Sequence, residues 1–131
     1  MFAVAQHTAD IRIEISAASP EDVFADGVRG LMEVMKPEVA GDAVTVTVEV
    51  ESPDLTALLV DFMNEILLRC HIRRQAFEPE SILLDENSVV ARLRATPVIR
   101  FEEDVKAVTY HEADVRRNDD GSWTTTIVLD V

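Results

Sequence analysis

Residues that alternate between apolar and polar types predict two strands in the first half of the chain. The clearer strand covers residues 44–50, where valines alternate with threonines and a glutamate. The other covers residues 11–15, where three isoleucines alternate with Arg12 and Glu14. Alternation places apolar side chains on one face of a sheet, so both strands are expected to be half buried. Residues 2–4 are expected to add a short edge strand.

Two stretches with the spacing of amphipathic helices follow these strands in turn. Ser19 is followed by Pro20 and two acidic residues, an order typical of a helix start, and apolar residues at helical spacing continue to Pro37. Residues 52–54 repeat the serine-proline-acid signal. A second helix is therefore predicted, with apolar residues from Leu55 to Cys70 on one broad face.

The second half of the chain is expected to be mostly β-structure. Pro97 is expected to separate a hairpin from an edge segment at residues 98–101. Residues 105–110 fit either a strand or a short helical turn. The order β-α-β-α-β-β-β-β indicates an α+β fold, with two helices packed on one face of a largely antiparallel sheet. The two expected hairpins flank polar turns and cover residues 81–84 with 89–95 and residues 115–117 with 123–129.

The chain is strongly acidic. Its length of 131 residues indicates one domain over residues 1–131, and 25 Asp and Glu against 12 Lys and Arg give a formal charge of −13. Nucleic-acid backbones are bound through lysine and arginine, so direct binding of RNA or DNA is not expected. A metal cation or a basic protein is a better partner for such a surface. Solubility alone explains the charge equally well.

The single cysteine and the apolar runs indicate a cytoplasmic location. Cys70 cannot form an intrachain disulfide, and its place in an apolar helical pattern indicates a buried, reduced thiol. Residues 1–6 are too short for a signal peptide and lack a basic start. No apolar run approaches the roughly 18 residues of a membrane span. A membrane partner is therefore not expected.

Carboxylates near the two ends of the sequence form the first candidate site. Asp10 stands at the start of the strand predicted at residues 11–15, and Asp130 stands one residue before Val131. If the two end strands are neighbours, both side chains and the terminal carboxylate of Val131 form one cluster of oxygen atoms. Hard cations such as calcium and magnesium prefer these ligands. Acidic residues at strand ends are more often simply solvated, so both interpretations stand.

An enzymatic interpretation uses some of the same residues. A metal-dependent hydrolase would use His7, Asp10 and Asp130. A histidine–aspartate pair can also act as a base with its orienting group, and Thr8, Thr109 or Tyr110 would then be the nucleophile. No Gly-x-Ser-x-Gly motif is present, and a hydrogen-bonded histidine at the end of a strand is the simpler interpretation of His7.

Lys106 is unusual because it interrupts an apolar segment. Its ammonium group can neutralise a carboxylate near the cluster of acidic groups. Alternatively, its aliphatic stem covers apolar surface while the amine reaches water. The composition of the segment does not favour either interpretation.

The sequence resembles the archease family in four places, in the family's order. Taken together they span nearly the whole chain, and they are specific jointly although none is specific alone. They are residues 7–10 (HTAD), the first helix through Leu31 and Met32, residues 58–67 of the second helix, and residues 105–111 (VKAVTYH) with the closing residues 129–131.

The resemblance implies a small α+β protein that is not itself an enzyme. Archeases assist the RtcB-type RNA ligase, which joins tRNA halves in tRNA splicing. They promote guanylylation of that ligase by GTP and allow multiple turnover. The resemblance also implies a bound divalent cation, usually calcium, at the positions of Asp10, Asp130 and Val131.

The resemblance extends to residues that would contact the partner. Lys106 lies in the family's signature block and is the next expected functional side chain, with His7, Tyr110 and His111 as further partner-binding or functional residues. Residues 96–104 depart from the family, because many archeases have a longer loop here with a Gly-Glu pair and another histidine. An alternative function is that of a chaperone-like modulator of a tRNA-modifying enzyme such as a methyltransferase.

Overall fold

The strands are divided between two antiparallel sheets. The computed structural model describes residues 1–6 and 10–131, and in this part of the chain there are nine strands and two helices. The first sheet has the order β1-β2-β9-β7, with β8 also paired to β9, and consists of β1 (Phe2–Gln6), β2 (Asp10–Ala17), β7 (Ala107–Thr109), β8 (Arg116–Arg117) and β9 (Trp123–Asp130). The second sheet is centred on β6 and consists of β3 (Pro37–Val39), β4 (Val44–Glu51), β5 (Gln75–Leu84) and β6 (Ser88–Phe101).

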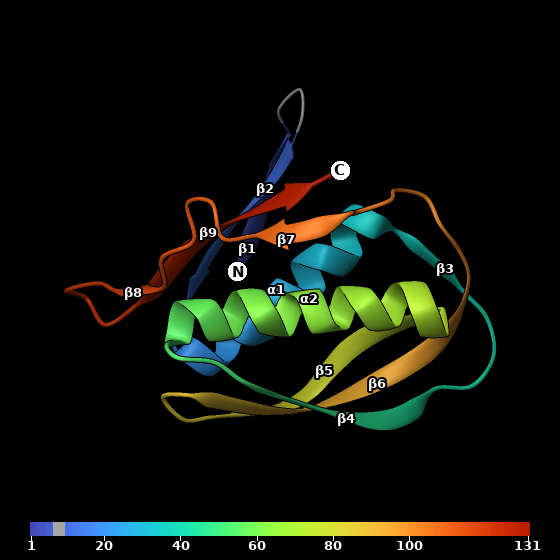
Figure 1. Cartoon of the computed structure of the whole chain (residues 1–131), viewed down its shortest axis with the longest axis horizontal. Helices are drawn as coiled ribbons and strands as arrows, with labels where there is room; N and C mark the ends of the chain where they lie inside the picture. The colour runs from blue at the N-terminus through green and yellow to red at the C-terminus, as the bar shows by residue number, and fades with distance from the viewer. Residues whose placement is uncertain (7–9) are drawn as a thin grey trace.

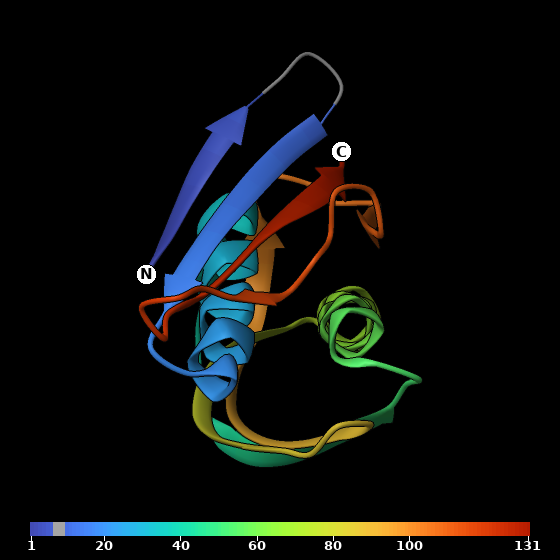
Figure 2. The same ribbon diagram turned by 90° about the vertical axis from the view of Figure 1, so that its left-hand side faces the viewer.

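The helices lie between the two sheets (Figures 1 and 2). Helix α1 (Pro20–Met35) contacts β2 of the first sheet and β5 of the second, and helix α2 (Leu55–Arg73) contacts β7 of the first and β4 of the second. The predicted α+β class and antiparallel pairing are confirmed. The strands form two sheets, however, where the sequence pattern was interpreted as one. The reason is that each helix buries apolar residues on more than one side, so a single sheet leaves part of it uncovered.

Both helices begin with a capping side chain, and one of the two was predicted correctly. Ser19 caps α1 as predicted, because its Oγ accepts a hydrogen bond of 3.1 Å from the backbone N–H of Asp22. The predicted start signal at residues 52–54 is shifted by two residues. Asp54 is the cap of α2 and accepts from the N–H of Ala57 at 2.9 Å, while Ser52 bonds elsewhere. A short acidic side chain caps as well as serine does, so the repeated pattern did not distinguish them.

Strand β6 continues through Pro97, where an interruption was predicted. Two flanking hydrogen bonds keep the ladder intact: the carbonyl of Pro97 accepts from Ala40 N–H at 3.0 Å, and the N–H of Val98 donates to the carbonyl of Arg74 at 2.8 Å. The end of β6 then pairs with β3, a strand that the sequence pattern did not predict. A proline removes only one donor from the ladder, and the hydrogen bonds on either side of it are made.

The core fills the space between the sheets. The rings of Phe24 on α1 and Phe62 on α2 lie 5.7 Å apart, and both side chains are fully buried. Cys70 is also fully buried, as predicted, and burial raises the pKa of its thiol to about 12. Among the described residues, no helix is both long enough and apolar enough to span a membrane.

Candidate metal and partner-binding site

The pairing of β2 with β9 brings Asp10 and Asp130 together. Asp10 is the direct cross-strand partner of Asp130, and Ile11 is the partner of Leu129. Side chains alternate along a strand, so the two apolar side chains face the helices and the two carboxylates share the outer face. The juxtaposition that the sequence analysis expected, if the end strands were neighbours, is therefore present.

The position of these carboxylates fits a hard cation. Directly opposed side chains in an antiparallel pair have Cβ atoms roughly 4.5–5.5 Å apart, which is close enough for two carboxylates to share one ion. The Oδ1 atom of Asp10 is buried and makes no hydrogen bond to the described residues. Ala107 is the neighbour of Asp130 on β7, and its small side chain leaves room beside the carboxylate.

The side chains alone supply a minimal ligand set. Outside residues 7–9, the structure has no group of three or more His, Cys, Asp or Glu side chains arranged to hold a metal. A cation bound by Asp10 and Asp130 would need further oxygen ligands. The carboxylate of Val131, backbone carbonyls and water molecules could supply them. Calcium takes about 6–8 oxygen ligands in all.

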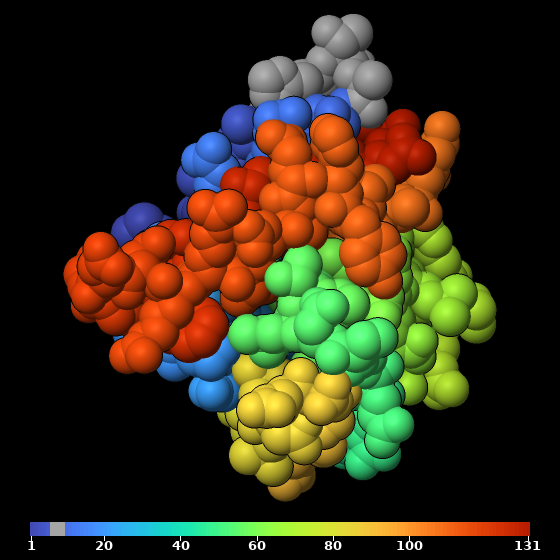
Figure 3. All heavy atoms as spheres, turned by 60° about the vertical axis from the view of Figure 1, so that its left-hand side comes forward, coloured from blue at the N-terminus to red at the C-terminus, as the bar shows by residue number. Residues whose placement is uncertain are grey.

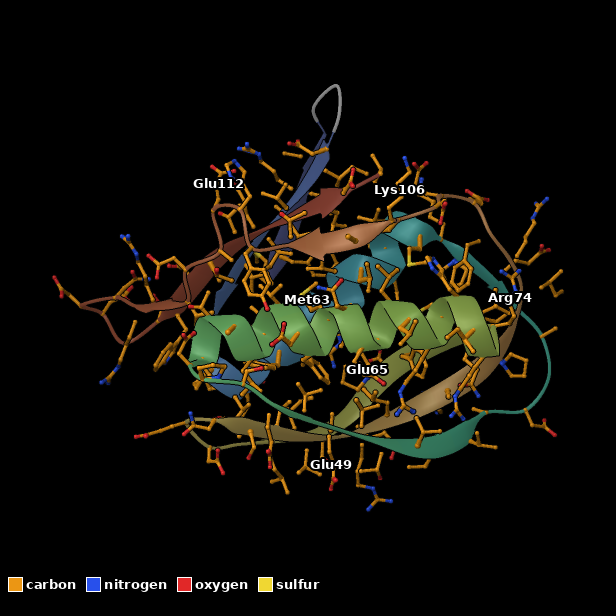
Figure 4. The ribbon with its side chains drawn as sticks, in the orientation of Figure 1. Glu49, Met63, Glu65, Arg74, Lys106 and Glu112 are labelled. Carbon is orange, nitrogen blue, oxygen red and sulfur yellow. The ribbon has the colours of Figure 1, made fainter. Side chains whose placement is uncertain are left out.

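Lys106 lies next to this pair of carboxylates. Its backbone N–H donates to the carbonyl of Asp130 at 2.8 Å, and its side chain is exposed at the upper edge of the first sheet (Figure 4). Within the described residues its ammonium group forms no ion pair shorter than 4.0 Å with a carboxylate. The amine is thus directed to solvent at the edge of the site.

Residues 110–113 form a turn that is fastened on two sides. The hydroxyl of Tyr110 donates to a carboxylate oxygen of Asp61 on α2, and the N–H of Ala113 donates to the carbonyl of Tyr110 at 3.1 Å. Glu112 has a φ of 62° and forms an ion pair of 2.8 Å with Arg12 on β2. Between them, His111 is exposed at the tip of the turn.

The hydrogen bond to Asp61 changes the acidity of Tyr110. Because the neutral hydroxyl donates to a carboxylate, the pKa of Tyr110 is raised above its ordinary value. The second oxygen of Asp61 accepts from the hydroxyl of Ser52 at 2.6 Å. Asp61 therefore joins the start of α2 to the turn at residues 110–113.

Two further side chains of α2 hold the same segment. The amide group of Asn64 bonds to both the N–H and the carbonyl of Val108, and the hydroxyl of Thr56 accepts from the N–H of Val115. The space-filling view shows the orange segment packed directly on the green start of α2 (Figure 3). Sequence reasoning assigned no role to Thr56, Asp61 or Asn64. Their signal is that all three are polar residues in a helix with a broad apolar face.

Other residues considered for chemistry have structural partners. The hydroxyl of Thr109 donates to the carbonyl of Val128 at 3.0 Å, which fastens β7 to β9. His71 is exposed on α2 and lies 3.4 Å from a carboxylate oxygen of Asp104. His7, a predicted functional residue, lies outside the described residues.

Fold and site together define a class of small α+β proteins in which two helices separate two antiparallel sheets and paired carboxylates stand on an outer face. A model of the archease protein family matches residues 2–131, so this chain belongs to the archease family. The resemblance seen in the sequence is confirmed.

Relatives and solved structures agree with this assignment. Proteins named archease from Methanopyrus kandleri and Methanosarcina barkeri are 31% and 29% identical to this chain, covering 96% and 95% of it and 96% and 92% of themselves. A crystal structure from Thermotoga maritima, described as an archease and possible chaperone, has a TM-score of 0.71 at 25% identity and covers 100% of this chain and 98% of its own. The solution structure of a Methanobacterium thermoautotrophicum protein shares the fold, with a TM-score of 0.70 at 23% identity and coverage of 99% and 98%.

Proposed function

We propose that this chain is a non-catalytic accessory protein that activates an RtcB-type RNA ligase in tRNA splicing. It would promote guanylylation of the ligase by GTP and so allow multiple turnover. The observation that carries the proposal is the direct pairing of Asp10 with Asp130 in a member of the archease family. The formal charge of −13 supports a protein partner in preference to direct contact with RNA.

The proposal includes a divalent cation, with calcium as the expected ion. Asp10, Asp130 and the carboxylate of Val131 would hold it. The buried Oδ1 of Asp10, which has no hydrogen-bond partner among residues 1–6 and 10–131, supports this ligand set. A bound cation would supply positive charge and coordination positions for oxygen ligands. The carboxylates would also be relieved of their mutual repulsion across the strand pair.

The partner surface would surround this position. Lys106 is exposed immediately before β7 (Figure 4), and Tyr110 and His111 are exposed on the turn that follows it. His7 precedes Asp10 and completes the proposed set. The proposal also includes a cytoplasmic location, where a thiol such as that of Cys70 stays reduced.

Reconstitution with a cognate ligase tests the proposed activation. The ligase is incubated with limiting amounts of this protein, labelled GTP and RNA ends that carry a cyclic phosphate, and both labelled ligase and joined RNA are measured. We expect faster guanylylation and several joined molecules per ligase. Asp130→Asn should lose most of the effect, and Glu49→Gln, on the outer face of the second sheet (Figure 4), should keep it. Unchanged ligase turnover with the wild-type protein would contradict the proposal.

Calorimetric titration with calcium tests the proposed metal site separately. Wild-type protein should bind calcium, and Asp130→Ala should not, because a carboxylate ligand is removed. The variant should remain folded, with a thermal midpoint in a chelator at or slightly above that of the wild type, because Asp130 is exposed at a strand end and faces Asp10. Undiminished calcium affinity in the variant would refute the ligand set.

A second candidate function is that of a chaperone-like modulator of a tRNA-modifying enzyme such as a methyltransferase. It is favoured by the description of the Thermotoga maritima relative as a possible chaperone. Parallel pull-downs with the purified ligase and a purified tRNA methyltransferase discriminate the two functions. Retention of the methyltransferase alone would favour the second candidate, and retention of the ligase alone would eliminate it.

A further inference from the structure

Asn64 is a polar residue in the middle of α2 that contacts β7. Its side-chain Nδ2 donates to the carbonyl of Val108 at 2.8 Å, and its Oδ1 accepts from the N–H of Val108 at 2.9 Å. The same Nδ2 also lies 3.2 Å from the carbonyl of Val60 on its own helix. The carboxamide therefore pairs with β7 as a neighbouring strand would.

Strand β7 needs such a partner. It is three residues long and stands last in the strand order of the first sheet, so one side of its backbone faces away from β9. Unpaired backbone groups at a sheet edge are costly when they are removed from water, and Val108 is buried. The amide orientation follows from its partners, because the N–H of Val108 requires an acceptor and the carbonyl requires a donor.

The part of α2 that carries Asn64 is firmly packed in the core. Asn64 is flanked on α2 by Val60 and Met63, which are both fully buried, and the helix extends over 19 residues. The position of β7 relative to α2 is thus set by a short side chain on a fixed element. Among the twenty amino acids, a carboxamide supplies a donor and an acceptor in the same plane, as a peptide group does.

A short path leads from Val108 to the proposed site. Lys106 is two residues before Val108, and its N–H donates to the carbonyl of Asp130 at 2.8 Å. Ala107 is the cross-strand partner of Asp130. Movement of β7 therefore changes both the support of Asp130 and the position of the Lys106 amine.

From this geometry we infer that Asn64 is a positioning residue that holds β7 against α2 and thereby places Asp130 and Lys106. The functional meaning of these two residues rests on the proposed function. The placement itself does not, because it is defined by hydrogen bonds among described residues.

Hydrogen exchange at single amides tests the placement directly. Asn64→Leu keeps the branching of the side chain, with a larger volume, but can neither donate nor accept a hydrogen bond. We expect the Val108 amide to lose protection, and the Lys106 amide, bonded to Asp130, to exchange about tenfold faster or more. Thr56→Val is the matched control, because it removes one α2 hydrogen bond to Val115 and leaves β7 untouched. Wild-type protection of Lys106 in Asn64→Leu would overturn the inference.

A titratable variant distinguishes loss of these hydrogen bonds from a general loss of structure. In Asn64→Asp, an ionised carboxylate accepts from Val108 N–H but repels the Val108 carbonyl, whereas a protonated one donates to it. The folded-state pKa of the new carboxyl group is therefore raised. Its stabilising contact is complete below the unfolded-state pKa of about 3.9 and is lost as pH rises through the folded-state pKa. The difference in thermal midpoint from wild type should narrow as pH falls toward 4, and a difference that does not change with pH would overturn the inference.

Calcium titration of the same variants connects the placement to function. Asn64→Leu should bind calcium about tenfold more weakly than wild type, and Thr56→Val should bind it equally well, although both have lower thermal midpoints. If wild type binds no calcium, the proposed metal site fails and the exchange data still decide the role of Asn64. If wild type binds calcium and Asn64→Leu binds it equally well, the inference fails and the proposed function stands.

Discussion

The two sheets are built from different parts of the chain. The second sheet takes its strands from one continuous stretch, residues 37–101, whereas the first joins residues 2–17 to residues 107–130. Both cover the helices with apolar inner faces. Their outer faces differ: in the second sheet Arg94 is flanked by Glu78, whereas in the first sheet Asp10 directly faces Asp130.

This difference separates charge that stabilises the fold from charge that serves a site. Opposite charges across strands are mildly favourable, and like charges directly opposed are unfavourable. The first sheet therefore carries an electrostatic cost that the second avoids. Such a cost is typical of a functional site.

The largest effects are expected for matched leucines in the two sheets. Leu129 on β9 and Leu93 on β6 are both fully buried, so each change to alanine should lower the free energy of unfolding by about 2–5 kcal/mol. Urea denaturation measures this loss. Leu129→Ala should in addition weaken calcium binding, because it loosens the strand next to Asp130, whereas Leu93→Ala should not. Equal weakening by both variants would show that the site depends on global stability alone.

Two glycines of α1 should respond in opposite ways to alanine. A Cβ at Gly30 would stand 2.9 Å from Cγ2 of Ile13 on β2, a branched side chain with little freedom. Overpacking typically costs about 1–3 kcal/mol, and this outweighs the gain of about 1 kcal/mol from replacing glycine in a helix. A Cβ at Gly27 would meet the flexible Met63 at 3.0 Å, so the helix gain should prevail there.

Thermal unfolding of the two glycine variants distinguishes these outcomes. Gly30→Ala should unfold at a lower temperature than wild type, and Gly27→Ala at the same or a higher one. A stabilised Gly30→Ala would mean that α1 and the first sheet are packed less tightly than the distances indicate.

Charge changes on the two outer faces should have opposite signs. In a chelator, Asp130→Asn should raise the free energy of unfolding by about 0.2–1 kcal/mol, because it removes a like-charge pair. Glu78→Gln should lower it by a similar amount, since Glu78 faces Arg94 and pairs with Arg29 at 3.0 Å. Urea denaturation at low and high salt should show both effects shrinking with salt. The same sign for both variants would argue against the proposed contrast.

The smallest effect is expected at alkaline pH. Hydrogen bonding to Asp61 raises the pKa of Tyr110. The contact therefore stabilises the fold fully below the unfolded-state pKa of about 10, and this stabilisation is lost as pH rises through the folded-state pKa. Tyr110 is the one tyrosine of the sequence, so its ionisation is measured by ultraviolet absorbance without overlap from another tyrosine. Asp61→Asn should return the titration toward 10. A titration midpoint that is the same in both proteins would exclude the contact.

Elements governed by local patterns could be predicted from the sequence. The alternation at residues 44–50 and the serine cap at Ser19 are both present in the structure, because each depends on neighbours within a few positions. The division into two sheets depends on which helix faces are covered, which is a non-local property. Strand β3 and the passage of β6 through Pro97 were missed for the same reason.

The candidate site was predictable only in part. The pairing of Asp10 with Asp130 followed from their matching places near the two ends of the sequence. Asn64 and Asp61 were not assigned a role, because a polar residue on a helix usually faces solvent. Their role depends on contacts with β7 and the turn that follows it. The sequence of this segment fits either a strand or a short helical turn.

The place of β9 inside the first sheet has a consequence for folding during synthesis. Strand β9 lies between β2 and β7, yet it is the last strand along the chain, so the ribosome delivers it after the second sheet is complete. Until then β2 presents an open hydrogen-bonding edge to other chains. The charged residues Arg12 and Glu14 on that waiting strand, together with the acidity of the whole protein, discourage nascent copies from joining edge to edge.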